Sequence, residues 1–262
     1  MKIKHKLITG STLLALIPGI IIGLASVFTA TKNASVALEH TSEQQLISIR
    51  EITKQAVEDY FHHIDQQVKN LAISQKTITA MRDFSQAFAS YAEESGKTDV
   101  NNLKADLRDF YNNQFNRRFK ELNHGKSADI DKLIGGLDKN TLALQHSYIY
   151  ANSNPLGEKD KLDASSDDSK YSKAHKFNHP YFQDFLNRFG YYDIFLVDHN
   201  SGHIVYSVFK ELDYGTSLLN GPYAESGIAE AFKGSQELSQ NESILIDFKP
   251  YVPSYQASAS FI

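Results

Sequence analysis

The chain contains no cysteine and no tryptophan among its 262 residues. Without cysteine, neither a disulfide framework nor a thiolate metal site can form. The chain also has no surplus of basic residues, because its formal net charge is -4 at pH 7. No basic stripe with interleaved aromatic residues compensates for this, so nucleic acid is not an expected partner.

The motifs of common enzyme classes are missing as well. The sequence has no nucleophile elbow, no glycine-rich phosphate-binding loop and no dinucleotide fingerprint. Carboxylates occur in short-range pairs, Asp193 with Asp198 and Glu211 with Asp213, but such pairs are more often solvated or turn-stabilising than catalytic. We therefore expect no catalytic residues, no enzymatic activity and no cofactor.

His175 and His179 are four residues apart, a spacing that on a helix directs two imidazoles to one metal ion. Pro180 disfavours this arrangement, because the residue before a proline is pushed out of the α region. The pattern therefore predicts an extended His179, a helix that begins only after Pro180, and no metal site.

The N-terminus carries a long apolar run behind three lysines. Lys2, Lys4 and Lys6 lie within residues 1–6, and residues 7–30 contain no charged side chain. As a helix, the apolar run would be about 36 Å long, enough to cross a hydrocarbon core of roughly 30 Å. We expect a cytoplasmic N-terminus, an uncleaved transmembrane helix in the inner (cytoplasmic) membrane, and the remainder in the periplasm or outside the cell. The alternative is a cleaved signal peptide, which would have a shorter apolar region.

Residues 31–140 have a helical pattern. Apolar residues recur every three or four positions from Thr41 to about Glu94, which predicts a long amphipathic helix. Gly96 is a typical helix end, and Asp99 is a typical N-terminal cap for a second helix. A helix that runs along an extracellular domain and a coiled-coil stalk both fit this pattern, and we expect a homodimer in either case.

Residues 141–262 contain the β-strand patterns. Tyr191–Val197 and His203–Phe209 are rich in β-branched and aromatic residues and flank five turn-forming residues, which predicts a β-hairpin. Neither face of the second run is plainly polar, as in a strand at the centre of a sheet covered on both sides. Ser243–Phe248 and Ala257–Ile262 predict two further strands. Because the chain ends within the last of these, we expect a fragment of a longer protein with a truncated C-terminal lobe.

Aromatic residues are concentrated between Tyr171 and Tyr223. Core packing explains the phenylalanines. The tyrosines differ, because each buried hydroxyl needs a hydrogen-bond partner, and tyrosines beside a few charged side chains are typical of small-ligand pockets. The residues that we expect to bind a small-molecule ligand are Tyr171, His175, Arg188, Tyr191, Asp193, Tyr206, Lys210, Asp213 and Tyr223.

Two long strings, LQHSYIYANSNPLGEKDKLD and FGYYDIFLVDHNSGHIVYSVFKELDYGTSLLNGPYAESGIAEAF, resemble the extracellular sensor region of bacterial methyl-accepting chemotaxis proteins. The resemblance covers most of Leu144–Ile262, and related modules occur on some histidine kinases and cyclases. It implies an α+β fold, in which a long N-terminal helix from the membrane and a helical segment precede a Cache-like, that is PAS-like, antiparallel sheet flanked by helices. It also implies signalling to cytoplasmic chemotaxis proteins through parts outside this sequence.

The resemblance places Tyr223 and Asp247 at the positions of a ligand-binding tyrosine and aspartate in amino-acid-sensing Cache domains. The arginine and tryptophan pair of those domains has no match, since the chain lacks tryptophan. An amino acid is therefore not the expected ligand, and an organic acid, an amine or an accessory binding protein all stay open.

The sequence thus predicts the ligand-sensing region of a membrane-anchored chemotaxis transducer. The sensor region of a membrane histidine kinase or nucleotide cyclase is the alternative. An anchored structural or adhesion protein and a periplasmic hydrolase are rivals from other classes. A structural protein would have a fully packed lobe, whereas a sensor requires a cavity beside the hairpin.

Overall fold

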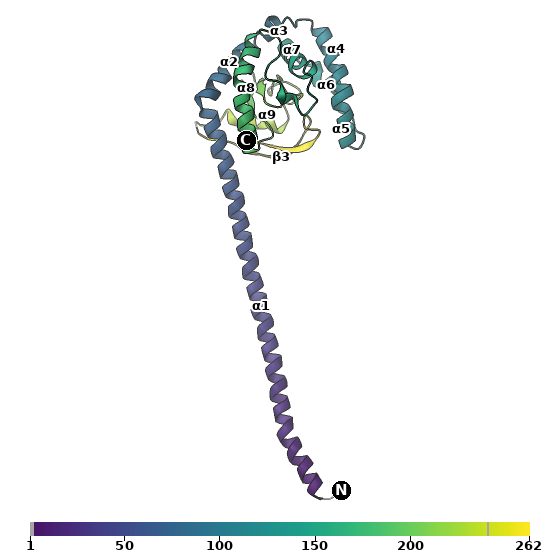
Figure 1. Cartoon of the computed structure of the whole chain (residues 1–262), viewed down its shortest axis with the longest axis vertical. Helices are drawn as coiled ribbons and strands as arrows, with labels where there is room; N and C mark the ends of the chain where they lie inside the picture. Colours follow the sequence, from purple (N-terminus) through teal and green to yellow (C-terminus); the bar gives the residue numbers. More distant parts are fainter. Residues whose placement is uncertain (1–2, 240) are drawn as a thin grey trace. The chain divides into compact units, whose positions relative to one another are not determined.

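The computed structural model describes residues 3–239 and 241–262. The chain forms two units, of which the first ends at Ile64 and the second comprises Asp65–Ile262 (Figure 1). The second unit combines helices with two antiparallel two-stranded sheets. The prediction of a mixed α and β fold with one long apolar N-terminal helix is confirmed.

The first unit is formed by α1 (Ile3–Ile73), whose last turns belong to the second unit. In its apolar segment, the hydroxyls of Thr29 and Thr31 donate to backbone oxygens four residues earlier, at 2.8 Å in each case. These bonds satisfy polar groups that would be costly in an apolar environment. By length and composition α1 is long and apolar enough to cross a membrane, and it is the one such helix among the described residues.

The helical pattern predicted from Thr41 onward is divided into three helices. α1 is followed by α2 (Gln75–Phe88) and α3 (Tyr91–Glu94). The first division lies at Ser74, whose hydroxyl oxygen accepts a hydrogen bond from Thr77 N at 3.1 Å. A serine cap satisfies a free N–H at the start of a new helix, so it competes with continuation of the preceding one. Apolar periodicity does not reveal this cap, because the spacing continues across it.

Six helical segments follow α3. Asp99 caps the first of them, since its carboxylate accepts a hydrogen bond from Asn102 N at 3.2 Å, as the sequence predicts. Two of the segments are π-helical turns, which are rare and are frequent at functional sites. The segments are α4 (Val100–Phe110), the π-helical turn η1 (Tyr111–Phe115), α5 (Asn116–Leu122), α6 (Ile130–Gly135), α7 (Lys139–Gln145) and the π-helical turn η2 (His146–Tyr150).

α8 (Lys170–Phe189) contains Pro180 in its interior, so the predicted helix start after this proline is wrong. Proline inside a helix costs about 3 kcal/mol. Against this, α8 buries Tyr171, Phe182 and Leu186, and a large apolar side chain contributes about 1.5–3 kcal/mol when it is fully buried. Packing of the buried face, which lies beside α2 in Figure 1, therefore outweighs the local preference.

The predicted hairpin exists but is shorter than expected. β1 (Phe195–Val197) pairs antiparallel with β2 (Ile204–Ser207). Beyond these strands, the carboxylate of Asp193 accepts hydrogen bonds from Val208 N at 2.9 Å and Phe209 N at 3.2 Å. A side chain thus replaces part of the strand ladder, and the regular pairing stops.

Both faces of β2 are covered, as the sequence predicts, since all four of its residues are buried. On its second edge His203 forms a bridge with Ser217, and Ile204 N donates to Thr216 O at 3.0 Å. The returning segment passes through Gly215, whose φ of +82° favours glycine. Among the described residues the sheet nevertheless has only two named strands.

The C-terminal part contains a helix and a second hairpin. α9 (Gly227–Ser235) precedes β3 (Ile246–Tyr251) and β4 (Ala257–Phe261), which pair antiparallel. Both strands were expected from the sequence. The turn between them holds Tyr255 and Gln256 at φ values of +57° and +67°, an uncommon conformation for residues other than glycine.

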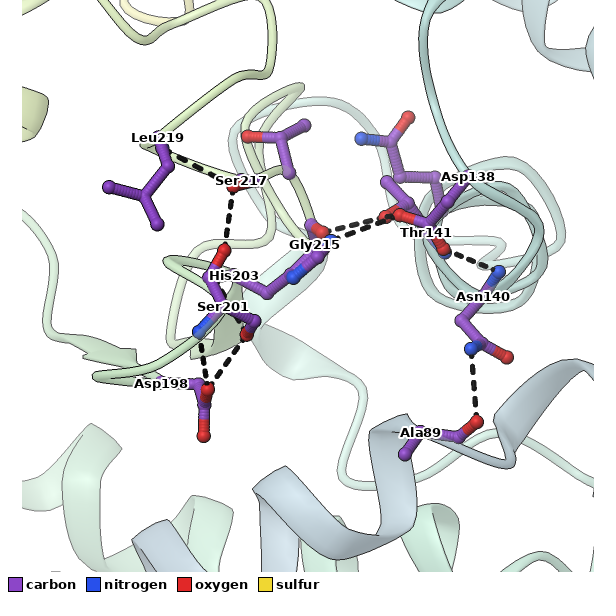
Figure 2. Close-up of polar contacts among 12 residues, drawn as sticks. Ala89, Asp138, Asn140, Thr141, Asp198, Ser201, His203, Gly215, Ser217 and Leu219 are labelled. Atoms are coloured by element: carbon purple, nitrogen blue, oxygen red, sulfur yellow. Dashed lines mark hydrogen bonds and ion pairs between the residues drawn. The ribbon is translucent and has the colours of Figure 1, made fainter.

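Polar contacts join the N-terminus of α7 to the first hairpin (Figure 2). Asp138 caps the helix by accepting hydrogen bonds from Asn140 N at 2.8 Å and Thr141 N at 3.1 Å. Its other carboxylate oxygen lies 3.1 Å from His203 Nε2, and the Thr141 hydroxyl lies 2.7 Å from Gly215 O. These contacts fix α7 against both segments that flank β2.

Candidate functional site

The side chains expected to bind a ligand do not form a single group in the folded chain. Arg188 is exposed on α8 and pairs with Asp184 at 2.6 Å. Asp247 is exposed on β3. Tyr191 is half-buried, and its hydroxyl donates to Gln67 Oε1 at 2.8 Å. None of these three expected residues lines the cavity described below.

Three other expected residues, Tyr171, His175 and Tyr206, belong to the aromatic core. Each is 0% exposed. Tyr206 stacks on Phe84 with 4.8 Å between ring centroids, and the Tyr171 hydroxyl donates to Val205 O at 2.6 Å. Their rings pack inside the protein, and core packing accounts for the two tyrosines. His175 Nδ1 contacts Asp163 O at 2.5 Å, whereas its buried Nε2 has no hydrogen-bond partner among the described residues.

His175 and His179 lie on the same buried face of α8, with ring centroids 4.6 Å apart. The prediction of an extended His179 is therefore wrong, because the helix continues through the following proline. His179 Nε2 lies 2.5 Å from Asp160 O. Because a backbone carbonyl oxygen can only accept a hydrogen bond, Nε2 must carry the ring proton. Nδ1 then accepts from the Tyr206 hydroxyl at 2.7 Å. Burial and the nearby Lys210 ammonium lower the pKa of His179 to about 3, and its ring is neutral at pH 7.

Lys210 is a fully buried lysine in a left-handed backbone conformation, with a φ of +56°. Its Nζ donates to Val208 O at 2.9 Å. Lys210 forms no ion pair with any described residue. Burial disfavours the charged form and lowers the pKa of Lys210 to about 7.

Lys159 is a second buried lysine, which the sequence reading missed. It begins η3 (Lys159–Lys161), a 3₁₀ turn in the polar loop after η2, and is 2% exposed. Its Nζ donates to Asn152 O at 2.7 Å, and it too lacks an ion-pair partner among the described residues. Burial lowers the pKa of Lys159 to about 8. No sequence signal marks it, because a lysine in a polar loop is normally solvated.

Three carboxyl groups lie in the same region as the lysines. Asp193 Oδ2 accepts a hydrogen bond from Ser207 Oγ at 2.7 Å, and Glu211 Oε1 accepts one from the Tyr192 hydroxyl at 2.9 Å. Burial, with a further contribution from Asp213, raises the pKa of Asp193 to about 7. Burial and the two neighbouring aspartates also raise the pKa of Glu211 well above its usual range.

Asp213 is the third of these groups and is 0% exposed. The Tyr251 hydroxyl donates to its Oδ2, whereas Oδ1 and the buried Tyr223 hydroxyl have no hydrogen-bond partner among the described residues. Burial raises the pKa of Asp213 to about 6. Of the residues expected from sequence, the structure therefore gathers Asp193, Lys210, Asp213 and Tyr223 into one region.

A cavity of about 10 Å³ lies beside both lysines. This volume holds about one water molecule, whereas small-molecule pockets usually measure about 300–1,000 Å³. Its walls come from η1, the loop before η3, the segment after β2 and the turn between β3 and β4. The residues that line it are Phe115, Leu156, Gly157, Lys159, Phe209, Lys210, Glu211, Leu212, Pro253 and Tyr255. A larger ligand would fit only after one of these segments moves.

A scan of protein-family models and searches of curated proteins and solved structures found no match for this chain. Among the described residues, no group of three or more histidine, aspartate or glutamate side chains is arranged to hold a metal ion.

Proposed function

We propose that this chain is the ligand-sensing region of a membrane-anchored signalling receptor of the chemotaxis-transducer type. One observation carries the proposal. The two strings that resemble chemoreceptor sensor regions supply Lys159 and Lys210 to the wall of the same small cavity. A buried charge without a partner lowers stability, and such groups concentrate where proteins bind or react with other molecules.

A structural or adhesion protein would have a fully packed lobe, and a cavity of about 10 Å³ comes close to that. The two buried lysines are what separates the proposal from this rival. A structural or adhesion protein gains nothing from two unpaired lysines at a cavity, which apolar residues would fill with a gain in stability. A hydrolase of the nucleophilic type needs a hydroxyl or thiol nucleophile beside a base. The residues that line the cavity include no serine, threonine, cysteine or histidine, so the site favours binding over covalent catalysis.

The proposal includes an arrangement in the membrane. The apolar segment of α1 crosses the inner membrane as an anchor, with residues 1–6 on the cytoplasmic side and the second unit outside. The two hairpins are parts of a PAS-like sheet. Two copies associate through α1, and the signal reaches cytoplasmic chemotaxis proteins through parts outside this sequence.

Contacts inside the second unit suggest how binding reaches α1. Tyr191 donates to Gln67 on the last turns of α1 at 2.8 Å, and Ser243 donates to Asp65. Tyr191 is two residues from Asp193, which holds the backbone beside Lys210. A ligand that moves this backbone would thus alter contacts with α1 and bias a two-state equilibrium.

A ligand screen tests the proposed function. The full chain in detergent micelles is heated with each member of a library of small metabolites, and unfolding is followed by circular dichroism. At least one compound is expected to raise the unfolding midpoint of the wild type but not of Lys210→Met. Lys233→Met, at an exposed lysine of α9, is the matched control and should respond like the wild type. The proposal fails if no compound stabilises the protein or if every stabilisation persists in Lys210→Met.

A further inference from the structure

The two buried lysines carry more hydrogen-bond donors than the protein uses. Each ammonium group has three N–H bonds and no acceptor. Lys210 Nζ donates to Val208 O at 2.9 Å, and Lys159 Nζ donates to Asn152 O at 2.7 Å. Two neutral carbonyl oxygens therefore satisfy one donor each. Lys159 Nζ also lies 5.3 Å from the centre of the Phe110 ring, but neither lysine receives a counter-charge through an ion pair with the described residues.

His179 does not supply the missing acceptor. Its Nε2 lies 3.4 Å from Lys210 Nζ, but the proton on this nitrogen is donated to Asp160 O at 2.5 Å. Nδ1, the other ring nitrogen, accepts a hydrogen bond from the Tyr206 hydroxyl. The histidine therefore presents an N–H and not a lone pair toward the lysine.

Two of the nearby carboxylates, those of Asp193 and Glu211, are engaged elsewhere. Asp193 accepts hydrogen bonds from the backbone N–H groups of Ile194, Val208 and Phe209 and from the Ser207 hydroxyl. Glu211 accepts from the Tyr192 hydroxyl at 2.9 Å and from Ser254 Oγ at 3.4 Å. Their oxygens hold the hairpin end and the β3–β4 turn in place and form no ion pair with the lysines, both of which line the cavity.

We propose that the cavity binds a small monocarboxylate between the ammonium groups of Lys159 and Lys210. The carboxylate would supply the missing acceptors and the counter-charge. Phe115, Phe209 and Leu212 line the same cavity and would pack against a short organic body. The lining contains two lysines and no arginine, so the bidentate guanidinium contact typical of many phosphate sites is missing.

Two segments that line the cavity could move to admit such a ligand. Lys159 lies on one of them, two residues after Gly157, which has a φ of +85°. Another includes Tyr255, which has a φ of +57°. Because the cavity holds about one water molecule, binding requires one of these segments to open and then close over the ligand. Closure of the first segment returns the Lys159 ammonium to the site.

This inference rests on the proposed sensing function and specifies its ligand, so the test separates the two. The full chain in detergent micelles is heated with sodium acetate, propionate or pyruvate. Propionamide, propylammonium chloride and sodium chloride serve as neutral, cationic and simple-salt controls at matched ionic strength. At least one carboxylate is expected to raise the unfolding midpoint by about 5–11 °C at a hundredfold excess over its Kd, and the controls should leave the midpoint unchanged.

Variants then locate the effect. Lys159→Met and Lys210→Met should lose the carboxylate response, whereas Lys161→Met, at an exposed neighbour paired with Glu158, should keep it. If a methionine variant does not fold, the comparison of propionate with propionamide on the wild type still decides. Equal shifts with propionamide, a response retained in both variants, or no response to any of the three carboxylates would overturn the inference. A response to propylammonium that depends on Lys210 would contradict the inference that the ligand is an anion, but it would still support the proposed sensing function.

Discussion

Lys210 connects the energetics of the second unit to the proposed binding site. Its ammonium group is fully buried and lacks an ion-pair partner among the described residues. Burial lowers its pKa from 10.5 to about 7, although Asp193, Asp160 and Asp163 act in the opposite direction. The charged lysine is therefore a source of instability near neutral pH, and a bound anion would remove it.

This lysine makes stability depend on pH in an unusual direction. Its folded pKa is lower than its unfolded pKa, so between about pH 7 and 10 the unfolded chain binds more protons and stability rises with pH. From pH 8 to 10, Lys210 alone should add about 2 kcal/mol to the free energy of unfolding. Lys159, with a pKa near 8, acts in the same direction. Urea unfolding at both pH values, followed by circular dichroism, measures the rise.

Lys210→Met isolates the contribution of this residue. The variant should show a smaller rise between pH 8 and 10 than the wild type, and Lys161→Met, at an exposed lysine, should behave like the wild type. An unchanged pH dependence in Lys210→Met would show that the burial of this ammonium does not control the effect.

Asp193 changes stability with pH in the opposite direction. Its pKa is raised to about 7 in the folded chain, so its contribution to stability falls as pH rises from about 4 to 7.

At the scale of elements, the cap of α7 holds the first hairpin in position. Burial opposes ionisation of Asp138, but hydrogen bonds from His203 and Thr141 outweigh it and lower the pKa of Asp138 to about 2. The contribution of this carboxylate is therefore present above about pH 4 and is lost as pH falls toward 2. The same side chain caps a helix and contacts His203, the residue directly before β2.

Replacing Asp138 should lower the free energy of unfolding more than replacing a helix cap that makes no tertiary contact. Asp138→Ala should lower the free energy of unfolding at pH 7 by about 2–3 kcal/mol, since it removes both the helix cap and the contact with His203. Asp99→Ala, at the exposed cap of α4, should cost about 1 kcal/mol. Urea unfolding of the two variants makes the comparison, and equal losses would contradict the proposed link between α7 and the hairpin.

Local signals in the sequence predicted several elements correctly. The Asp99 cap and the two strand pairs follow from helix-capping chemistry and β propensity. The break at Ser74 and the course of α8 through Pro180 were not predicted, because in both places a contact made in the folded chain overrides the local pattern. At Ser74, a serine cap starts a new helix where the apolar spacing predicts a continuous one. In α8, burial of one face stabilises the helix despite the proline in its interior.

The candidate site was predictable in the same partial way. Asp193, Lys210 and Asp213 lie at the ends of recognisable strands, where the sequence placed them. Lys159 and Tyr255 come from loops far apart in the chain, and the folded structure alone brings them to the same cavity. No periodicity or motif in the sequence predicts that these two loops lie close together, because the positions of loops are set by tertiary contacts.

At the scale of the whole molecule, α1 is the element that would carry a signal. Its residues in the first unit include large apolar side chains that are exposed in a single chain, among them Leu46, Ile49, Val57 and Tyr60. Together with Thr53 they recur every three or four positions, as expected of a helix face that packs against a second copy. Gln55 lies on the other side of the helix by the same periodicity.

Cross-linking of α1 tests the central claim, that ligand binding in the second unit is transmitted through a dimer of this helix. The chain has no cysteine of its own, so Val57→Cys and Gln55→Cys each introduce one reporter. In membranes under mild oxidation, Val57→Cys should form disulfide-linked dimers much faster than Gln55→Cys. The compound that most stabilises the protein should change the Val57→Cys rate at least about twofold, and Lys210→Met should abolish that change. Equal rates at the two positions, or a rate that the bound compound leaves unaltered, would contradict the account.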